Sequence, residues 1–248
     1  MPGMEEAVAE LNAEYRGLED VLRSLTPDQW LLPTPAEGWD IRDQVSHLAD
    51  TNEVCFDTVT GGPRNLNDEA VSFGSPESYT ESGVGKGRIM DPAAVLEWWS
   101  STAKRTADAL LTKDPKERVP WGLGMSSRMM ATARLMEHWA HGGDICGALK
   151  LAPSKSPRLR SIAFLTLSAV PYAFSVGDVE KPAGTLRAEL DYESETWHIG
   201  PEDADNVISG DAFEFCRLGI RRIKRTDTKL KAVGPLAEAA LDNLRAFL

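Results

Sequence analysis

Apolar residues recur every three or four positions over four segments of the chain between Met4 and Leu149. This spacing places them on one face of a helix, which can then be buried against neighbouring helices. The pattern therefore predicts amphipathic helices in all four segments. In the first segment, residues 4–25, the apolar positions are Ala7, Leu11, Tyr15, Leu18, Leu22 and Leu25.

The other three segments begin with residues that favour helix starts. Asp40 can accept the amide hydrogen of Asp43, Asp91 is followed by a proline at the first helical position, and Ser126 can cap the last helix. We expect helices over residues 41–59, 92–111 and 127–149. Four amphipathic helices predict a four-helix bundle.

The connection over residues 61–88 is rich in Gly, Ser, Asn and Pro. A connection of this length is uncommon in a compact domain unless it is functional, mobile or partly helical. We interpret it as a candidate lid. Its GVGKGR stretch matches neither a Walker nor a Rossmann phosphate loop.

The pattern changes after Leu149, where LAPSKSPRL has the composition of an inter-domain linker. We place a boundary near residue 152, between a first domain over residues 1–151 and a second over residues 152–248. The second domain combines short alternating segments, typical of strands, with helical spacing. The predicted fold class is therefore α+β, an N-terminal four-helix bundle followed by a small α+β domain. The expected strands are residues 185–192, 195–200, 206–210 and 228–234, and the expected helices are residues 161–174 (interrupted by Pro171), 210–223 and 235–248.

Charge and composition narrow the function classes. The chain has 38 acidic and 27 basic residues, a formal net charge of −11 and a pI near 4.9. Such a surface repels phosphate backbones and anionic lipids, so we expect no nucleic-acid or membrane partner. No segment approaches the roughly 20 apolar residues that span a bilayer, and the acidic start does not resemble a signal peptide. Together with three widely separated cysteines, Cys55, Cys146 and Cys216, this predicts a cytoplasmic protein.

Glu137 and His141 are four residues apart on the last bundle helix and therefore share a face. His47 lies midway along the second helix. A bundle that packs these two helices side by side would bring two imidazoles and a carboxylate together. This donor set suits zinc, or else nickel, cobalt or iron, and three protein ligands leave room for water or substrate.

Several neighbours of this triad have more than one interpretation. Asp144, one turn after His141, is placed to orient a ligand imidazole from the outer shell, and whether His138 takes part is open. Gly142 and Gly143 weaken the helix by about 1 kcal/mol each relative to alanine, which close approach to the backbone would explain. Alternatively, the histidines are packing residues and the Glu/His spacing is fortuitous. The aromatic residues near the motif form either a pocket wall or the core: Trp98, Trp99, Trp121 and Trp139.

The segments GWDIRDQVSHLAD and MSSRMMATARLMEHWAHGGDI together resemble the DinB-like superfamily of metal-binding four-helix bundles. Within it, they are most similar to the branch of mycothiol-dependent maleylpyruvate isomerase. The run from Glu195 to Pro235 resembles a small accompanying domain labelled wyosine-base-formation-like. The resemblance implies that His47, Glu137 and His141 bind the metal. It also implies an active-site arginine on the C-terminal domain, and either Arg221 or Arg222 fits that position.

Three functions follow as hypotheses. The first is a metal-dependent isomerase or transferase, in which mycothiol or another small thiol attacks a small-molecule substrate and the arginine pair holds an anionic group. The second is a metal-dependent hydrolase with Asp43 or His138 as the base. The third is a non-enzymatic, metal-stabilised binding protein whose C-terminal domain binds a ligand or forms a homodimer. A role in tRNA modification, suggested only by the domain label, is disfavoured by the acidic charge.

Overall fold

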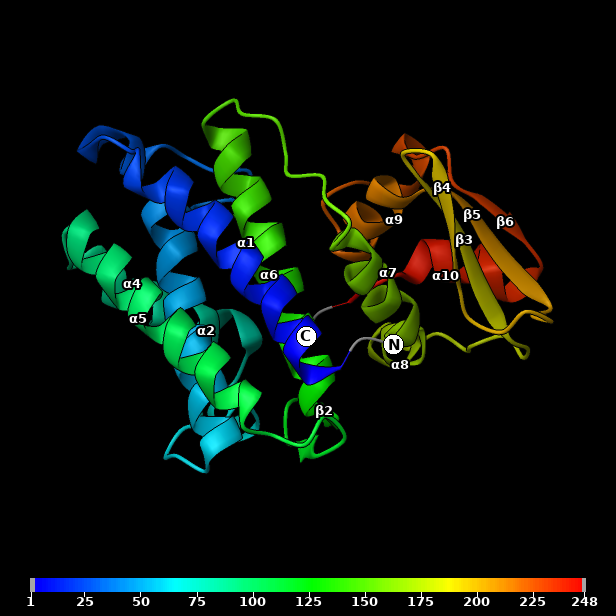
Figure 1. Ribbon diagram of the computed structural model, residues 1–248, viewed down its shortest axis with the longest axis horizontal. Coiled ribbons are helices and arrows are strands. Elements are labelled where there is room, and N and C mark those ends of the chain that lie inside the picture. Colours follow the sequence, from blue (N-terminus) through cyan, green and yellow to red (C-terminus); the bar gives the residue numbers. More distant parts are fainter. Residues whose placement is uncertain (1–2, 247–248) are drawn as a thin grey trace. The chain divides into compact units, whose positions relative to one another are not determined.

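The computed structural model describes residues 3–246, which separate into two compact units between Ser154 and Lys155. Figure 1 shows that the first unit is built almost entirely of helices and that the second combines helices with a sheet. The predicted α+β fold class, a helical bundle followed by a small α+β part, is confirmed. The division falls within the linker-like stretch, a few residues after the predicted boundary.

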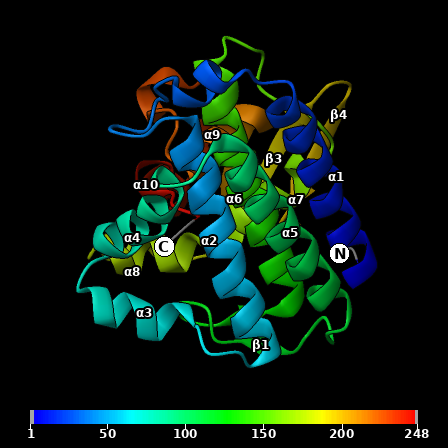
Figure 2. The same cartoon turned by 90° about the vertical axis from the view of Figure 1, so that its left-hand side faces the viewer.

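Four long helices form the bundle of the first unit. Helices α2 and α5 pack together, α1 packs against both α5 and α6, and α2 packs against α6. Figure 2 looks onto this bundle. The helix that carries His47, α2, and the helix that carries Glu137 and His141, α6, are therefore direct neighbours. The bundle helices are α1 (Met4–Arg23), α2 (Ile41–Thr60), α5 (Pro92–Leu111) and α6 (Ser127–Ala148).

The predicted helix starts are confirmed. The Asp40 carboxylate accepts the amide hydrogen of Asp43 at 2.9 Å, and Asp91 does the same for Ala94 at 2.9 Å. The Ser126 hydroxyl accepts from the amide of Met129 at 3.2 Å. These caps satisfy backbone donors that the helix itself leaves unpaired, so local sequence defines where each helix begins.

Residues 61–88, which we interpreted as a candidate lid, are largely helical. They form two helices, α3 (Leu66–Phe73) and α4 (Pro76–Arg88), and α4 packs along α2. Two glycines of α4 make this approach possible. A Cβ at Gly83 would lie 2.6 Å from Asp50 Oδ2, and one at Gly87 would lie 1.7 Å from Ser46 Oγ. The glycines therefore serve close helix packing.

Ion pairs also hold this segment to α2. The buried Asp50 carboxylate accepts hydrogen bonds from Arg64 at 3.0 Å and Lys86 at 2.5 Å. Arg88 donates two hydrogen bonds of 3.0 Å to Asp43. Because Asp43 and Asp50 are buried, these pairs compensate charges that would otherwise be costly in the interior.

Short elements complete the first unit. A 3-10 helix, η1 (Pro27–Leu31), precedes α2, and a two-residue antiparallel hairpin, β1 (Arg118–Val119) with β2 (Met125–Ser126), precedes α6. The sequence pattern did not predict them, because elements this short carry no periodic signal.

The second unit is built around one mixed four-stranded sheet of order β4-β3-β5-β6. Strands β3 and β5 are parallel, and the other neighbours are antiparallel. Helices α9 and α10 pack against it and bury residues such as Leu190, Ile208 and Phe215. The helical run expected to break at Pro171 is interrupted two residues earlier, at Ala169 between α7 and α8, and Pro171 is the second residue of α8. The elements are α7 (Leu159–Ser168), α8 (Val170–Val176), β3 (Leu186–Tyr192), β4 (Glu195–Ile199), β5 (Asn206–Asp211), α9 (Ala212–Gly219), η2 (Arg225–Asp227), β6 (Lys231–Val233) and α10 (Pro235–Asn243).

No single helix within residues 3–246 is long and apolar enough to cross a membrane, and only α7 and α8 taken together, across a 51° bend, pass a test of length and composition.

Candidate metal centre

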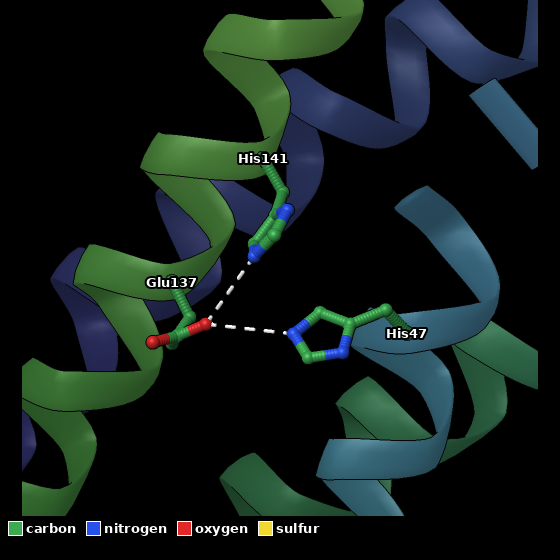
Figure 3. Close-up of side chains that lie close together, drawn as sticks. All are labelled: His47, Glu137 and His141. Carbon is green, nitrogen blue, oxygen red and sulfur yellow. Dashed lines mark ion pairs between the residues drawn. The ribbon is translucent and has the colours of Figure 1, made fainter. Parts of the chain in front are cut away.

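Three potential metal ligands meet between α2 and α6. Glu137 Oε2 lies 3.4 Å from His141 Nε2 and 3.7 Å from His47 Nε2. Figure 3 shows the two imidazoles directed toward the same carboxylate from different helices. All three donor atoms lie within 4.8 Å of one another. The structure thus brings together the three residues that helical spacing and family resemblance select.

The donor set fits a divalent ion. Atoms that share a tetrahedral zinc at about 2.0–2.1 Å are separated by about 3.3–3.4 Å. The separations of 3.4 and 3.7 Å are close to this value, so small side-chain adjustments would be enough. The side chains of His141, His47 and Glu137 are 11%, 13% and 22% exposed. The triad is therefore recessed, and part of each side chain still reaches solvent.

A chain of hydrogen bonds defines which nitrogen of His141 is available. The Thr34 hydroxyl donates to the carbonyl oxygen of Trp39 at 3.0 Å and accepts from Gln44 Nε2 at 2.8 Å. The Gln44 amide oxygen therefore faces His141 Nδ1, at 2.5 Å. An amide oxygen can only accept, so Nδ1 carries the proton and Nε2 presents its lone pair to the ligand cluster.

Trp39 covers the two imidazoles. Its ring centroid lies 5.4 Å from that of His47 and 6.2 Å from that of His141, in a nearly parallel arrangement with the latter. The indole thus limits the positions of both rings. It also keeps water from one side of the candidate centre.

The electrostatics of the triad favour the protonation states that a metal requires. Burial alone would raise the pKa of Glu137, but its contacts with His141 and His47 outweigh burial and hold the pKa well below its ordinary value. Burial lowers the pKa of His47, with Glu137 opposing the shift. The carboxylate is therefore ionised and the His47 imidazole neutral at neutral pH, ready to coordinate.

His138 is directed away from the triad. Its Nδ1 donates to the carbonyl oxygen of Arg134 at 2.8 Å, and its Nε2 accepts from the Trp99 indole at 3.2 Å. The ring is fully buried, and burial lowers its pKa well below the ordinary value. His138 is thus a neutral core residue, and Trp99 belongs to the same core.

The remaining expected site residues have mixed outcomes. Nδ1 of His141 faces Gln44, and its Nε2 faces Glu137. Gln44, on another helix, therefore orients the His141 imidazole, a role that was expected of Asp144. Asp144 is buried on α6, and any other role there stays a prediction. The glycines after His141 are not needed for close packing: a Cβ at Gly142 would meet Leu18 at an ordinary 3.8 Å, and Gly143 has no described atom within 4 Å.

Arg221 and Arg222 follow α9 in the second unit. Arg221 is exposed and has a left-handed backbone conformation, with φ of 56°. Arg222 donates to the carbonyl oxygen of Ile220 at 3.3 Å. The expected contribution of one of these arginines to the active site stays a prediction.

Gln44, Thr34 and Trp39 were not identified from the sequence. Gln44 is three residues before His47, so helical spacing places both on the same side of the helix, but it does not show that Gln44 reaches His141 on another helix. Thr34 and Trp39 lie in the irregular segment before α2, where periodicity gives no information. A glutamine one turn before a ligand histidine is the signal that could have suggested an outer-shell partner.

Comparisons with known proteins agree with this architecture. Residues 11–146 match the family model of the mycothiol maleylpyruvate isomerase N-terminal domain. Two uncharacterized proteins of Mycobacterium tuberculosis, from strains CDC 1551 and H37Rv, are each 36% identical to the chain over 242 residues, 97% of this chain and 94% of theirs.

Two solved structures have a similar fold. The crystal structure of the mycothiol-dependent maleylpyruvate isomerase aligns with a TM-score of 0.63 and 17% identity over 96% of each chain. A histidine-to-alanine mutant of such an isomerase aligns with a TM-score of 0.59 and 15% identity over 88% of each chain. At these identities the likeness shows a common fold.

Proposed function

Because the chain belongs to the family of the mycothiol maleylpyruvate isomerase N-terminal domain, we propose that it is a divalent-metal enzyme that uses a small thiol, as an isomerase or a transferase. The observation that carries the proposal is the convergence of His47, Glu137 and His141 on one recessed, partly exposed point. Zinc is the ion that this donor set suits best, and mycothiol is the thiol suggested by the relatives.

The three residues would hold the ion, and their neighbours would maintain the geometry. When bound, a divalent ion supplies positive charge that favours the thiolate form of a small thiol, which is then nucleophilic at neutral pH. Gln44 and Thr34 hold His141 in the required tautomer. Trp39 limits access of water from one side. The residues of the chain thus bind and orient, and the thiol performs the chemistry.

The two proposed reactions differ in how the thiol adduct ends. In an isomerase, the thiolate adds to a conjugated carbon–carbon double bond, the resulting single bond rotates, and elimination restores both the double bond and the thiolate. No atom is gained or lost overall. In a transferase, a proton completes the adduct, which is released as the product.

The hydrolase hypothesis receives less support from the structure. Of its two expected bases, Asp43 accepts two hydrogen bonds from Arg88, and both ring nitrogens of His138 are engaged in the core. Neither group is free to take a proton from water at the candidate centre.

Metal analysis of the purified protein tests the proposal. We expect about one zinc per wild-type chain, a large loss in His47→Ala and His141→Ala, and no loss in His198→Ala, which changes an exposed histidine outside the triad. Calorimetric titration of the zinc-loaded protein with mycothiol should then show binding that disappears in His47→Ala. Equal zinc contents in wild type and His47→Ala would contradict the metal centre, and a loaded protein that binds no thiol would contradict the thiol-dependent reaction.

A further inference from the structure

Three polar contacts follow one another between helices α2 and α6. In order along α2, they are Gln44 with His141, His47 with Glu137, and Thr51 with Arg134. Each step of three or four residues forward along α2 is matched by a step of three or four residues backward along α6, as expected where two helices pack antiparallel. The candidate metal centre belongs to the middle contact, and Arg134 belongs to the contact one turn beyond it.

Arg134 is buried, and its hydrogen bonds reach the backbone that carries His47. The residue is only 2% exposed. Its Nε donates to Asn52 Oδ1 at 3.2 Å, and its Nη2 donates to Thr51 Oγ1 at 3.0 Å. The Thr51 hydroxyl in turn donates to the carbonyl oxygen of His47 at 2.8 Å. One planar guanidinium thus engages two successive residues of α2, and through Thr51 it reaches the turn that carries a candidate ligand.

The layer around Arg134 contains residues of all four bundle helices. The Asn52 amide nitrogen lies 3.5 Å from Nε2 of His138 on α6, and the Asn52 backbone carbonyl oxygen accepts from the Thr106 hydroxyl on α5 at 2.9 Å. Burial raises the pKa of the Tyr15 phenol on α1, and the neighbouring Arg134 opposes that rise. The partners of the guanidinium are therefore held in place themselves, which limits how far Arg134 can turn.

Glu137 supplies the negative charge that accompanies Arg134. The hydrogen-bond acceptors of the guanidinium are neutral groups, and a buried cation is strongly unfavourable unless an anion compensates it. Burial raises the pKa of Glu137, whereas its contacts with His141 and His47 and the positive charge of Arg134 lower it. The two opposite charges, one turn apart on α6, therefore stabilise each other before any ion binds.

We propose that Arg134 is a positioning residue of the candidate metal centre and holds the turn of α2 that carries His47 in register with Glu137 on α6. The inference rests on the metal centre of the proposed function and adds a residue that assembles it. A slip of α2 by one residue along α6 would move His47 by about 1.5 Å, well beyond the roughly 0.5 Å within which a binding constellation must be held. The paired donors of Arg134 resist such a slip, because it would break the hydrogen bonds to both Thr51 and Asn52.

Cobalt titration of the metal-free protein tests this role, because the visible absorption of bound Co²⁺ reports the geometry of its ligands. Arg134→Lys keeps the positive charge but loses the paired donors, so we expect cobalt affinity to fall about 10- to 100-fold and the spectrum to change. Thr51→Val should also weaken cobalt binding, and Thr51→Ser, which keeps the hydroxyl, should restore the wild-type affinity and spectrum. Thr58→Val, two turns further along α2, should bind cobalt like the wild type, because this hydroxyl donates to Val54 on its own helix.

Two comparisons separate positioning from other effects of these substitutions. Removal of a nearby positive charge would by itself strengthen the binding of a divalent ion, so weaker cobalt binding by Arg134→Gln indicates lost positioning. Leu135→Val removes packing volume at the adjacent, fully buried position of α6. It should lower the melting temperature of the metal-free protein and leave cobalt affinity and spectrum unchanged.

Wild-type cobalt affinity and spectrum in Arg134→Lys and Thr51→Val would overturn the inference, as would an equal loss of cobalt affinity in Leu135→Val. If the Arg134 variants do not fold, Thr51→Val and Thr51→Ser decide. A wild type that binds no cobalt, or binds it no better than His47→Ala, would contradict the metal centre and this inference with it. Cobalt binding without thiol binding would contradict only the proposed reaction.

Discussion

At the scale of single residues, Gln44 controls the chemistry of His141. The amide of Gln44 is oriented by Thr34, and its oxygen leaves Nδ1 of the imidazole as the only nitrogen that can carry the proton. Nε2 is therefore available before any ion arrives. Outer-shell partners of this kind fix ligand orientation and increase metal affinity.

Gln44→Ala should weaken zinc affinity about 10- to 100-fold while the helical fold remains. Thr34→Val should have a smaller effect in the same direction, because Gln44 can then rotate. Titration against a competing chelator measures both. Thr58→Val is the matched control, since this α2 hydroxyl donates to the backbone carbonyl of Val54 on its own helix. Unchanged zinc affinity in Gln44→Ala would contradict the orienting role.

The lowered pKa of the buried His138 imidazole makes the stability of the fold depend on pH. Burial holds the pKa of its imidazole well below the ordinary value of 6.5, so the unfolded chain binds a proton more readily than the folded one. The stability contributed by neutral His138 is complete above about pH 6.5 and falls on acidification, by up to about 1.4 kcal/mol per pH unit. The metal-free wild type should lose melting temperature between about pH 7 and pH 5.

His138→Gln should melt at a lower temperature at neutral pH but lose less on acidification than the wild type. His198→Gln, at an exposed position, should follow the wild-type curve. Parallel curves for wild type and His138→Gln would show that this imidazole does not titrate on unfolding.

The sequence could predict the ligands but not their supports. Glu137 and His141 share a helix face because of their spacing, which is a local property, and His47 needed only the expectation that two helices are neighbours. Gln44 and Trp39 act through contacts between separate segments, and their positions depend on how the irregular segment before α2 folds back.

At the scale of elements, the contact between α4 and α2 depends on glycines. Gly87 lies so close to Ser46 that a Cβ would overlap its side chain, whereas Gly85 on the same helix has no described atom within 4 Å. Overpacked side chains force backbone shifts that typically cost about 1–3 kcal/mol.

Gly87→Ala should therefore lower the free energy of unfolding by at least about 1 kcal/mol, because α4 must move away from α2. Gly85→Ala should leave it unchanged or raise it by about 0.5–1 kcal/mol through better helix propensity. Chemical denaturation of the two variants measures the difference. Equal effects of the two substitutions would mean that α4 is not held against α2 at Gly87.

Elements were predictable where local chemistry determines them. Caps at Asp40, Asp91 and Ser126 mark helix starts in the sequence and in the structure. Residues 61–88, which form α3 and α4, were interpreted as a candidate lid because the connection is long and rich in residues such as glycine and serine, which weaken helix propensity. The benefit that offsets this weakness is close packing against α2, a tertiary contact that composition cannot reveal.

At the scale of the whole molecule, the bundle has a core that does not depend on an ion. Four helices bury an extended apolar interior, including Leu11, Leu48, Trp99 and Leu135. The triad lies at the edge of this core. Metal binding should therefore add stability to a fold that already exists, unlike small domains that fold only around their metal.

Removal of zinc by a chelator should lower the melting temperature by roughly 5–11 °C, the effect of losing about 2.7 kcal/mol of binding at a ligand concentration 100-fold above the dissociation constant. Far-ultraviolet circular dichroism at 25 °C should remain helical. His47→Ala should already melt like the chelated wild type and respond little to the chelator. Complete unfolding on chelation would favour the hypothesis of a metal-stabilised binding protein.

Anomalous diffraction from crystals of the zinc-loaded protein, recorded on both sides of the zinc absorption edge, tests the central claim most directly. We predict one anomalous peak bounded by Nε2 of His47, a carboxylate oxygen of Glu137 and Nε2 of His141. A peak at other residues, or none between α2 and α6, would contradict it.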